Sequence, residues 1–164
     1  MTARRMLAGA ILAAATTAAA CDPPMVSPPF RDPTPARVTV GDLARLRWIV
    51  GDWRGTGAHQ APFYERYRFE DDSTLVVESF ADSTFARATE ATRFALRGGR
   101  LGPDERTAAS RIDARSVTFA PQRPGPNWYQ FRYVNRDAWT AVLWYPATQA
   151  RPERTVIYDM RRVR

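Results

Sequence analysis

Residues 63–80, FYERYRFEDDSTLVVESF, decide the fold class of this chain. The first half alternates, so that Phe63, Glu65 and Tyr67 share one face of an extended strand. The DDS that follows is typical of a turn, and the β-branched and aromatic residues of 74–80 predict a returning strand. This stretch therefore predicts an antiparallel β-hairpin.

The two-residue alternation of a strand recurs towards the C-terminus. Further strands are expected at residues 116–120, 128–134, 138–145 and 154–163. Asn135-Arg-Asp137 predicts a tight hairpin turn between two of them. Residues 84–97 are ambiguous, since their threonines favour a strand and their alanines and charged residues favour a helix. We expect a strand there, because the neighbouring strands need a pairing partner.

One short helix is expected before the strands. Leu43, Leu46 and Ile49 recur at helical spacing, Asp42 is the predicted N-cap, and Gly51 ends the run. A single helix is too little to cover so many strands, so closing the sheet on itself is the simplest way to bury its apolar face and remove its edges. The predicted fold is an all-β, antiparallel up-and-down barrel with one short N-terminal helix.

Residues 46–57, LRWIVGDWRGTG, resemble the opening of calycin barrels of the lipocalin and nitrobindin type. They are especially similar to an uncharacterised family of small exported bacterial domains that open L-x-W-L-x-G-x-W-x-G. Calycins stack a late arginine on the tryptophan of the G-x-W element at the closed end of the barrel. The resemblance implies this structural role for Trp53 and Arg162, because Arg162 shares the face of Tyr158 and Met160.

The N-terminus has the features of an export signal. Arg4 and Arg5 precede an apolar, alanine-rich segment at 6–20, and the AAAC that ends at Cys21 resembles a lipobox. Lipidation of Cys21 is the favoured interpretation, and an ordinary signal cleaved nearby, which leaves a free thiol, is the alternative. Asp22 matches the inner-membrane retention signal of enterobacterial lipoproteins, which implies a lipid anchor on the periplasmic face of the inner membrane.

Three segments follow from these features. Residues 1–20 are a lipoprotein signal peptide, 21–40 are the lipidated cysteine and a proline-rich tether, and 41–164 are the barrel domain. The chain has 24 basic and 17 acidic residues, and every basic residue is an arginine, which indicates codon bias more than a selected cationic surface. No basic run is present, so we do not expect nucleic acid as a partner. The expected partners are the membrane, through the lipid anchor, and a small apolar ligand. The oligomeric state stays open.

Few residues offer catalysis or metal binding. The chain has one cysteine and one histidine, His59, which lies in a loop between strands, and it lacks a nucleophile elbow and a phosphate loop. We therefore predict no catalytic residues, no metal and no cofactor. Haem binding of the nitrobindin type is a minor alternative, because the haem-ligating histidine of that group lies near the C-terminus and residues 155–164 contain none.

Glu65 is the leading candidate for function, because it shares an inward face with aromatic residues where a carboxylate is costly unless paired or solvated. Glu90 is a candidate second carboxylate. Tyr67, Tyr133 and Trp139 complete the predicted ligand-binding set. The expected function is non-catalytic binding of a small apolar or amphipathic molecule. The alternative is an envelope interaction module with a filled barrel and exposed aromatic residues, and an enzyme comes third.

Overall fold

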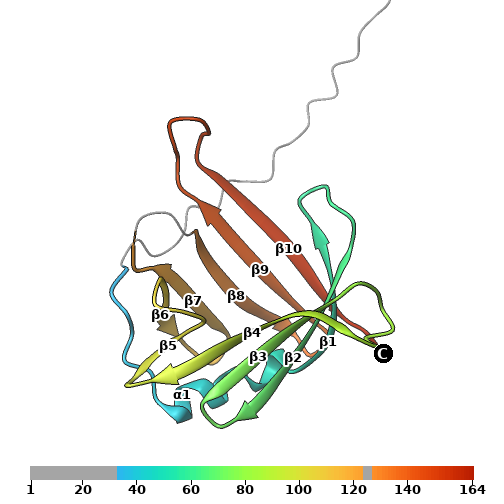
Figure 1. The fold of residues 1–164 in the computed structure, drawn as a ribbon, viewed down its shortest axis with the longest axis horizontal. Coiled ribbons are helices and arrows are strands. Elements are labelled where there is room, and N and C mark those ends of the chain that lie inside the picture. The colour runs from blue at the N-terminus through green and yellow to red at the C-terminus, as the bar shows by residue number, and fades with distance from the viewer. Residues whose placement is uncertain (1–32, 124–126) are drawn as a thin grey trace, which may run out of the picture.

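The computed structural model describes residues 33–123 and 127–164, and its chain forms a nearly closed antiparallel barrel (Figure 1). A short helix, α1 (Val40–Ala44), continues into the 3₁₀ helix η1 (Arg45–Ile49). The ten described strands are β1 (Gly51–Gly57), β2 (Phe63–Asp71), β3 (Thr74–Phe80), β4 (Ala88–Arg97), β5 (Arg100–Gly102), β6 (Thr107–Ile112), β7 (Ser116–Pro121), β8 (Trp128–Asn135), β9 (Ala138–Tyr145) and β10 (Arg154–Arg162). The predicted fold class is confirmed.

The predicted signal peptide, Cys21 and the start of the tether lie outside the described residues. Neither helical segment of the described chain has the length or hydrophobicity needed to span a bilayer.

Each described strand pairs with its neighbours in sequence, except that β5 and β6 do not pair with each other, and β1 also pairs with β10. This order leaves β5 and β6 as the two edges, and they face each other at the gap in the barrel wall. The guanidinium of Arg100 bridges part of the gap by donating to the backbone carbonyls of Asp104 and Thr107, at 2.9 and 3.0 Å. The barrel is therefore continuous everywhere except along this one seam.

The segment before α1 also crosses the seam. Its Ala36 N–H donates to the Ala109 carbonyl on β6, and its Val38 N–H donates to the Gly99 carbonyl in the β4–β5 turn. Val38 is 2% exposed and belongs to the core. The folded barrel thus includes residues that precede position 41.

The helix begins earlier than the sequence suggested. Thr39 is the N-cap, and Asp42 occupies the third helical position instead of the cap predicted for it. The Thr39 hydroxyl accepts from the Asp42 N–H, and the Asp42 carboxylate accepts from the Thr39 N–H, which forms a reciprocal capping box. The prediction that Asp42 is the N-cap is wrong, because the extended backbone of Thr39 places the cap three residues upstream.

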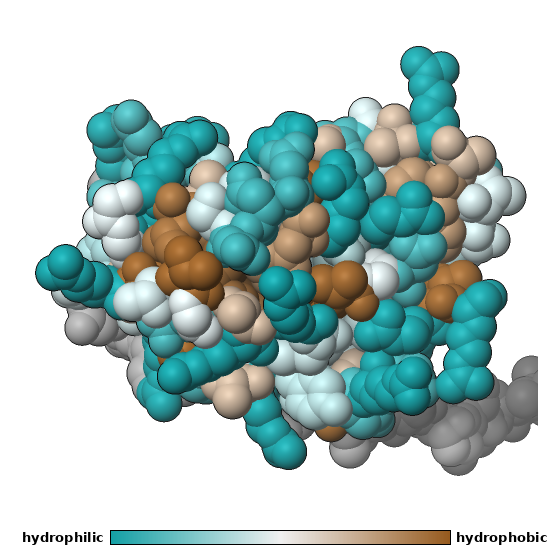
Figure 2. Space-filling view, turned by 90° about the horizontal axis from the view of Figure 1, so that it is seen from below, coloured by the Kyte–Doolittle hydropathy of each residue, from teal (hydrophilic) through white to brown (hydrophobic). Residues whose placement is uncertain are grey.

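The helix closes the lower end of the barrel, opposite the β1–β2 and β9–β10 loops (Figure 1). Leu43, Leu46 and Ile49 project into the barrel and are at most 1% exposed. Figure 2 shows this end from below, where hydrophilic residues surround smaller patches of hydrophobic surface. The lower half is thus filled with side chains, and any interior space lies above it.

The ambiguous stretch 84–97 is a strand from Ala88 onwards, as the pairing argument predicted. The preceding loop folds Phe85 back against the outer face of the barrel, where its ring contacts Tyr64 and Phe80. The sequence did not predict β5 and β6. β5 has three residues, and TAASRI of β6 has small and polar side chains with no clear alternation.

Candidate functional site

A pocket of about 330 Å³ occupies the upper half of the barrel. Six strands supply its walls: β2, β3, β4, β8, β9 and β10. Its lining is Phe63, Glu65, Tyr67, Val77, Ser79, Glu90, Thr92, Phe94, Tyr129, Phe131, Trp139, Ala141, Leu143, Tyr158 and Met160. The walls are mainly aromatic and aliphatic, and a few polar groups are placed among them, as is typical of small-molecule sites.

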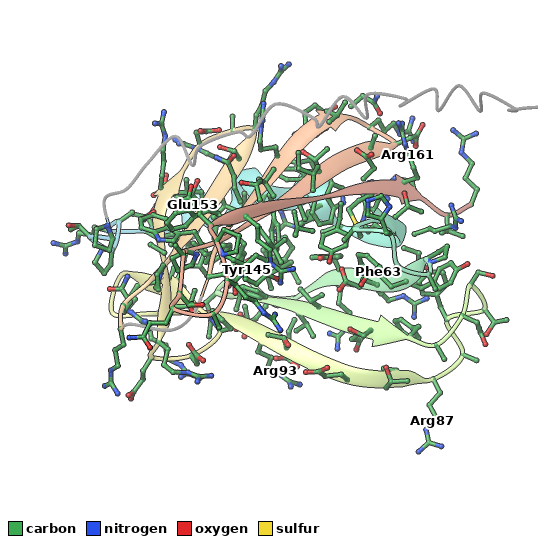
Figure 3. The ribbon with its side chains drawn as sticks, turned by 90° about the horizontal axis from the view of Figure 1, so that it is seen from above. Phe63, Arg87, Arg93, Tyr145, Glu153 and Arg161 are labelled. Atoms are coloured by element: carbon green, nitrogen blue, oxygen red, sulfur yellow. The ribbon has the colours of Figure 1, made fainter. Side chains whose placement is uncertain are left out.

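Strand alternation aims these side chains inward. On β2 the lining residues are Phe63, Glu65 and Tyr67, at every second position. In the view from above, Phe63 lies inside the ring of strands, whereas Arg87 and Arg93 project away from it (Figure 3). A side chain at Gly55 would collide with the Phe63 ring, so the glycine opposite Phe63 leaves room for that ring at the pocket wall.

Glu65 lies in the pocket wall beside Tyr67. The Tyr67 hydroxyl donates to Glu65 Oε2 at 2.7 Å, and within the described residues this is the one hydrogen bond that the carboxylate accepts. Burial raises the pKa of Glu65, and the hydrogen bond from Tyr67 opposes that rise without cancelling it. Burial also raises the pKa of Tyr67, and the nearby carboxylate adds to this rise, so Tyr67 stays a protonated donor at neutral pH.

Glu90 lines the same pocket from β4. Ser79 on β3 lies directly opposite Glu65 on one side and Glu90 on the other. Adjacent strands are about 4.8 Å apart, so the backbones of the two glutamates are about 10 Å apart across the sheet. Glu90 is exposed whereas Glu65 is partly buried, so the two carboxylates lie at different depths.

Neither glutamate forms a salt bridge with a described residue, and no arginine is among the described lining residues. Outward-facing carboxylates on β2 and β3 behave differently. Glu78 on β3 pairs with Arg68 at 2.9 Å, and Glu70 on β2 pairs with Arg93 at 3.0 Å. The pocket therefore contains two carboxyl groups without a basic partner among the described residues, in a chain whose formal net charge is +7.

Trp139 and Tyr133 are direct partners in the β8–β9 pairing, but only Trp139 is in the pocket lining. Trp139 lines the pocket, is 1% exposed, and packs edge-on against Tyr67 and Phe131 with ring centroids 5.3 and 5.1 Å apart. Its indole Nε1 is buried and has no hydrogen-bond acceptor among the described residues. Tyr133 lies outside the lining, where its ring contacts Trp48 of η1 at 5.7 Å. Of the predicted ligand-binding set, the structure brings together Glu65, Tyr67 and Trp139.

Trp53 and Arg162 meet below the pocket. They are direct partners in the β1–β10 pairing, and the Arg162 guanidinium carbon lies 4.2 Å from the centre of a Trp53 ring. Trp53 donates from Nε1 to the Ile49 carbonyl at 2.7 Å, and Arg162 donates to the Val50 carbonyl at 2.9 Å. The pair thus ties the helical segment to the first and last strands.

Comparisons with protein-family models, curated proteins and solved structures find no match for this chain. The barrel architecture is consistent with a calycin, but the assignment to one particular family rests on the sequence motif alone.

His59 lies away from the pocket lining. It is exposed in the turn between β1 and β2 and has a positive φ of 54°. Sequence reasoning missed Ser79, Thr92 and Tyr129 as lining residues. Alternation within each strand would place Ser79 beside Val77 and Thr92 beside Phe94, but the depth of each residue in the barrel depends on how the strands pair.

Proposed function

We propose that this protein is a membrane-anchored bacterial lipoprotein of the calycin type that binds a small apolar or amphipathic molecule in its barrel. The lipid anchor at Cys21 and the envelope location rest on the N-terminal sequence. The ligand rests on the pocket, and the observation that carries it is an aromatic cavity of about 330 Å³ above a filled lower half.

The size of the pocket limits the ligand. Pockets for small molecules and cofactors have volumes of about 300–1,000 Å³, so this one belongs at the small end of that range. A compact ligand with one or two rings fits this volume better than a long acyl chain.

The alternative of a filled barrel that docks a partner has less support. It requires exposed aromatic side chains, and the large hydrophobic residues that the described chain exposes are aliphatic: Val40, Val50, Val134 and Ile157. They are scattered over α1, the η1–β1 junction, β8 and β10 and form no continuous strip along one strand.

Native mass spectrometry of a soluble form that begins at residue 33 tests the proposal, because a bound molecule travels with the folded protein. We expect either a retained small molecule or one-to-one binding of the neutral fluorescent probe N-phenyl-1-naphthylamine. Leu143→Trp, which fills the pocket wall, should abolish binding, whereas Val142→Trp on the opposite face of β9 should not. A bare protein whose probe signal is the same in both variants would favour the filled-barrel alternative.

A further inference from the structure

The charge of the pocket contrasts with that of the protein surface. The acidic side chains in the lining are two glutamates, and no arginine is among the described lining residues. All of the arginines in the described chain lie elsewhere, and several of them pair with outward-facing carboxylates of the same sheet. An anionic ligand would meet unpaired negative charge inside this pocket, and a cationic one would neutralise it.

The position of Glu65 also favours a cationic ligand. It is the deeper of the two carboxylates, and the hydroxyl of Tyr67 fixes one of its oxygens and leaves the other without a hydrogen-bond donor among the described residues. A carboxylate that is partly desolvated and lacks a cationic partner destabilises a fold unless a ligand supplies that partner. The aromatic rings of Phe63, Phe131 and Tyr158 line the same space and favour a cation through their faces.

The wall opposite these carboxylates is aromatic. Trp139 on β9 lines the pocket and packs edge-on against Tyr67 and Phe131. The pocket thus has carboxylate acceptors on β2 and β4 and an aromatic wall on β9 in one lining.

We propose that the barrel pocket selects a small organic cation, an amine on a compact ring system, whose ammonium group binds Glu65 between aromatic walls. This inference rests on the proposed ligand-binding function and specifies its ligand class. Glu90, exposed at the pocket, attracts the ammonium group, and Glu65 holds it at depth. Carboxylate ligands such as fatty acids are disfavoured by the same two charges.

The test compares three probes that share one aromatic body: 1-naphthylmethylamine, 1-naphthylmethanol and 1-naphthoate. Each is titrated at pH 7 into residues 22–164, the exported chain without its lipidated cysteine, by calorimetry and naphthyl fluorescence. We expect the amine to bind about tenfold more tightly than the alcohol, and the carboxylate to bind most weakly. Glu65→Gln should abolish the difference in affinity between amine and alcohol.

Glu78→Gln is the matched control, since Glu78 lies on the outer face of β3 next to Ser79 and pairs with Arg68. It should keep the preference for the amine. If the alcohol binds as tightly as the amine, or if Glu65→Gln leaves the preference intact, the cation proposal is wrong and the ligand-binding function still stands. If none of the three probes binds, both proposals fail.

Discussion

Replacing Glu65 by Gln should stabilise the folded protein at neutral pH, even though it changes a hydrogen-bonded residue in the barrel interior. Burial raises the pKa of Glu65 in spite of the Tyr67 hydrogen bond, which means that the fold favours the neutral form of this side chain. Gln is neutral at every pH, has nearly the same shape, and keeps a carbonyl oxygen that accepts from the Tyr67 hydroxyl. The change therefore removes the charge and preserves the contact.

The magnitude follows from two opposing effects. A hydrogen bond to a charged acceptor contributes about 1.5–3 kcal/mol and one to a neutral acceptor about 0.5–1.5 kcal/mol, so the substitution loses about 1 kcal/mol. Full burial of a carboxylate costs several kcal/mol, and the partial exposure of Glu65 reduces that cost to about 2 kcal/mol. The net expectation is about 1 kcal/mol of added stability, or a rise in Tm of about 3–5 °C.

The effect should depend on pH in a defined direction. The ordinary pKa of a glutamate is 4.5, and below it the carboxyl is neutral in both the folded and the unfolded chain. Glu65 then costs nothing, and the two proteins should melt together near pH 4. As the pH rises above 4.5 and through the raised pKa of the folded state, the wild type loses stability relative to the variant, and the gap widens.

Thermal unfolding followed by circular dichroism at several pH values between 4 and 7 measures this gap. Glu78→Gln serves as a control, since it breaks an ion pair with Arg68 on the outer surface and should not raise the Tm. A Glu65→Gln protein that melts below the wild type at pH 7 would refute the reasoning. It would mean that the Tyr67 hydrogen bond outweighs desolvation and that Glu65 is held in place for structural reasons.

Trp53→Ala should cost about 3–5 kcal/mol in chemical denaturation, because Trp53 is fully buried, and Arg162→Ala should cost less because it removes a partly solvated side chain; equal costs would contradict this ranking. Cys21→Ala should move the protein from the detergent phase to the aqueous phase of a phase-partition assay, and an unchanged distribution would remove the lipid anchor from the proposal. Haemin titrated into the protein should give no sharp Soret shift, and a saturable one-to-one signal that disappears in His59→Ala would reverse that expectation.

Much of the fold could be predicted from local patterns in the sequence. The alternation in 63–69 correctly placed Phe63, Glu65 and Tyr67 on one inward face, because the two-residue period of a strand is a property of the backbone itself. The shortage of helices correctly indicated that the sheet would cover itself. By contrast, β6 was missed because TAASRI carries no strong local signal and is held in place by pairing with β7 and by the segment before α1.

The candidate site could be predicted from the sequence only in part. The sequence identified Glu65 as an inward carboxylate but left open whether it would meet an arginine or a cavity. Alternation also places Tyr133 and Trp139 inward, and the two are direct partners in the β8–β9 pairing. Both rings contact Trp48, yet only Trp139 is in the pocket lining. Which of two paired inward residues reaches the cavity depends on the side chains that pack around each of them, and those side chains come from other strands and from η1.

The sequence by itself thus determined which side chains face inward, since that property repeats every two residues along one strand. Tertiary structure alone decided that Glu65 and Glu90 share one pocket with Ser79 between them and that no arginine among the described residues reaches it. The reason is that these relations join residues on different strands. Their distances follow from hydrogen-bond pairing and from the way the helix fills the lower end, and no single strand encodes either of them.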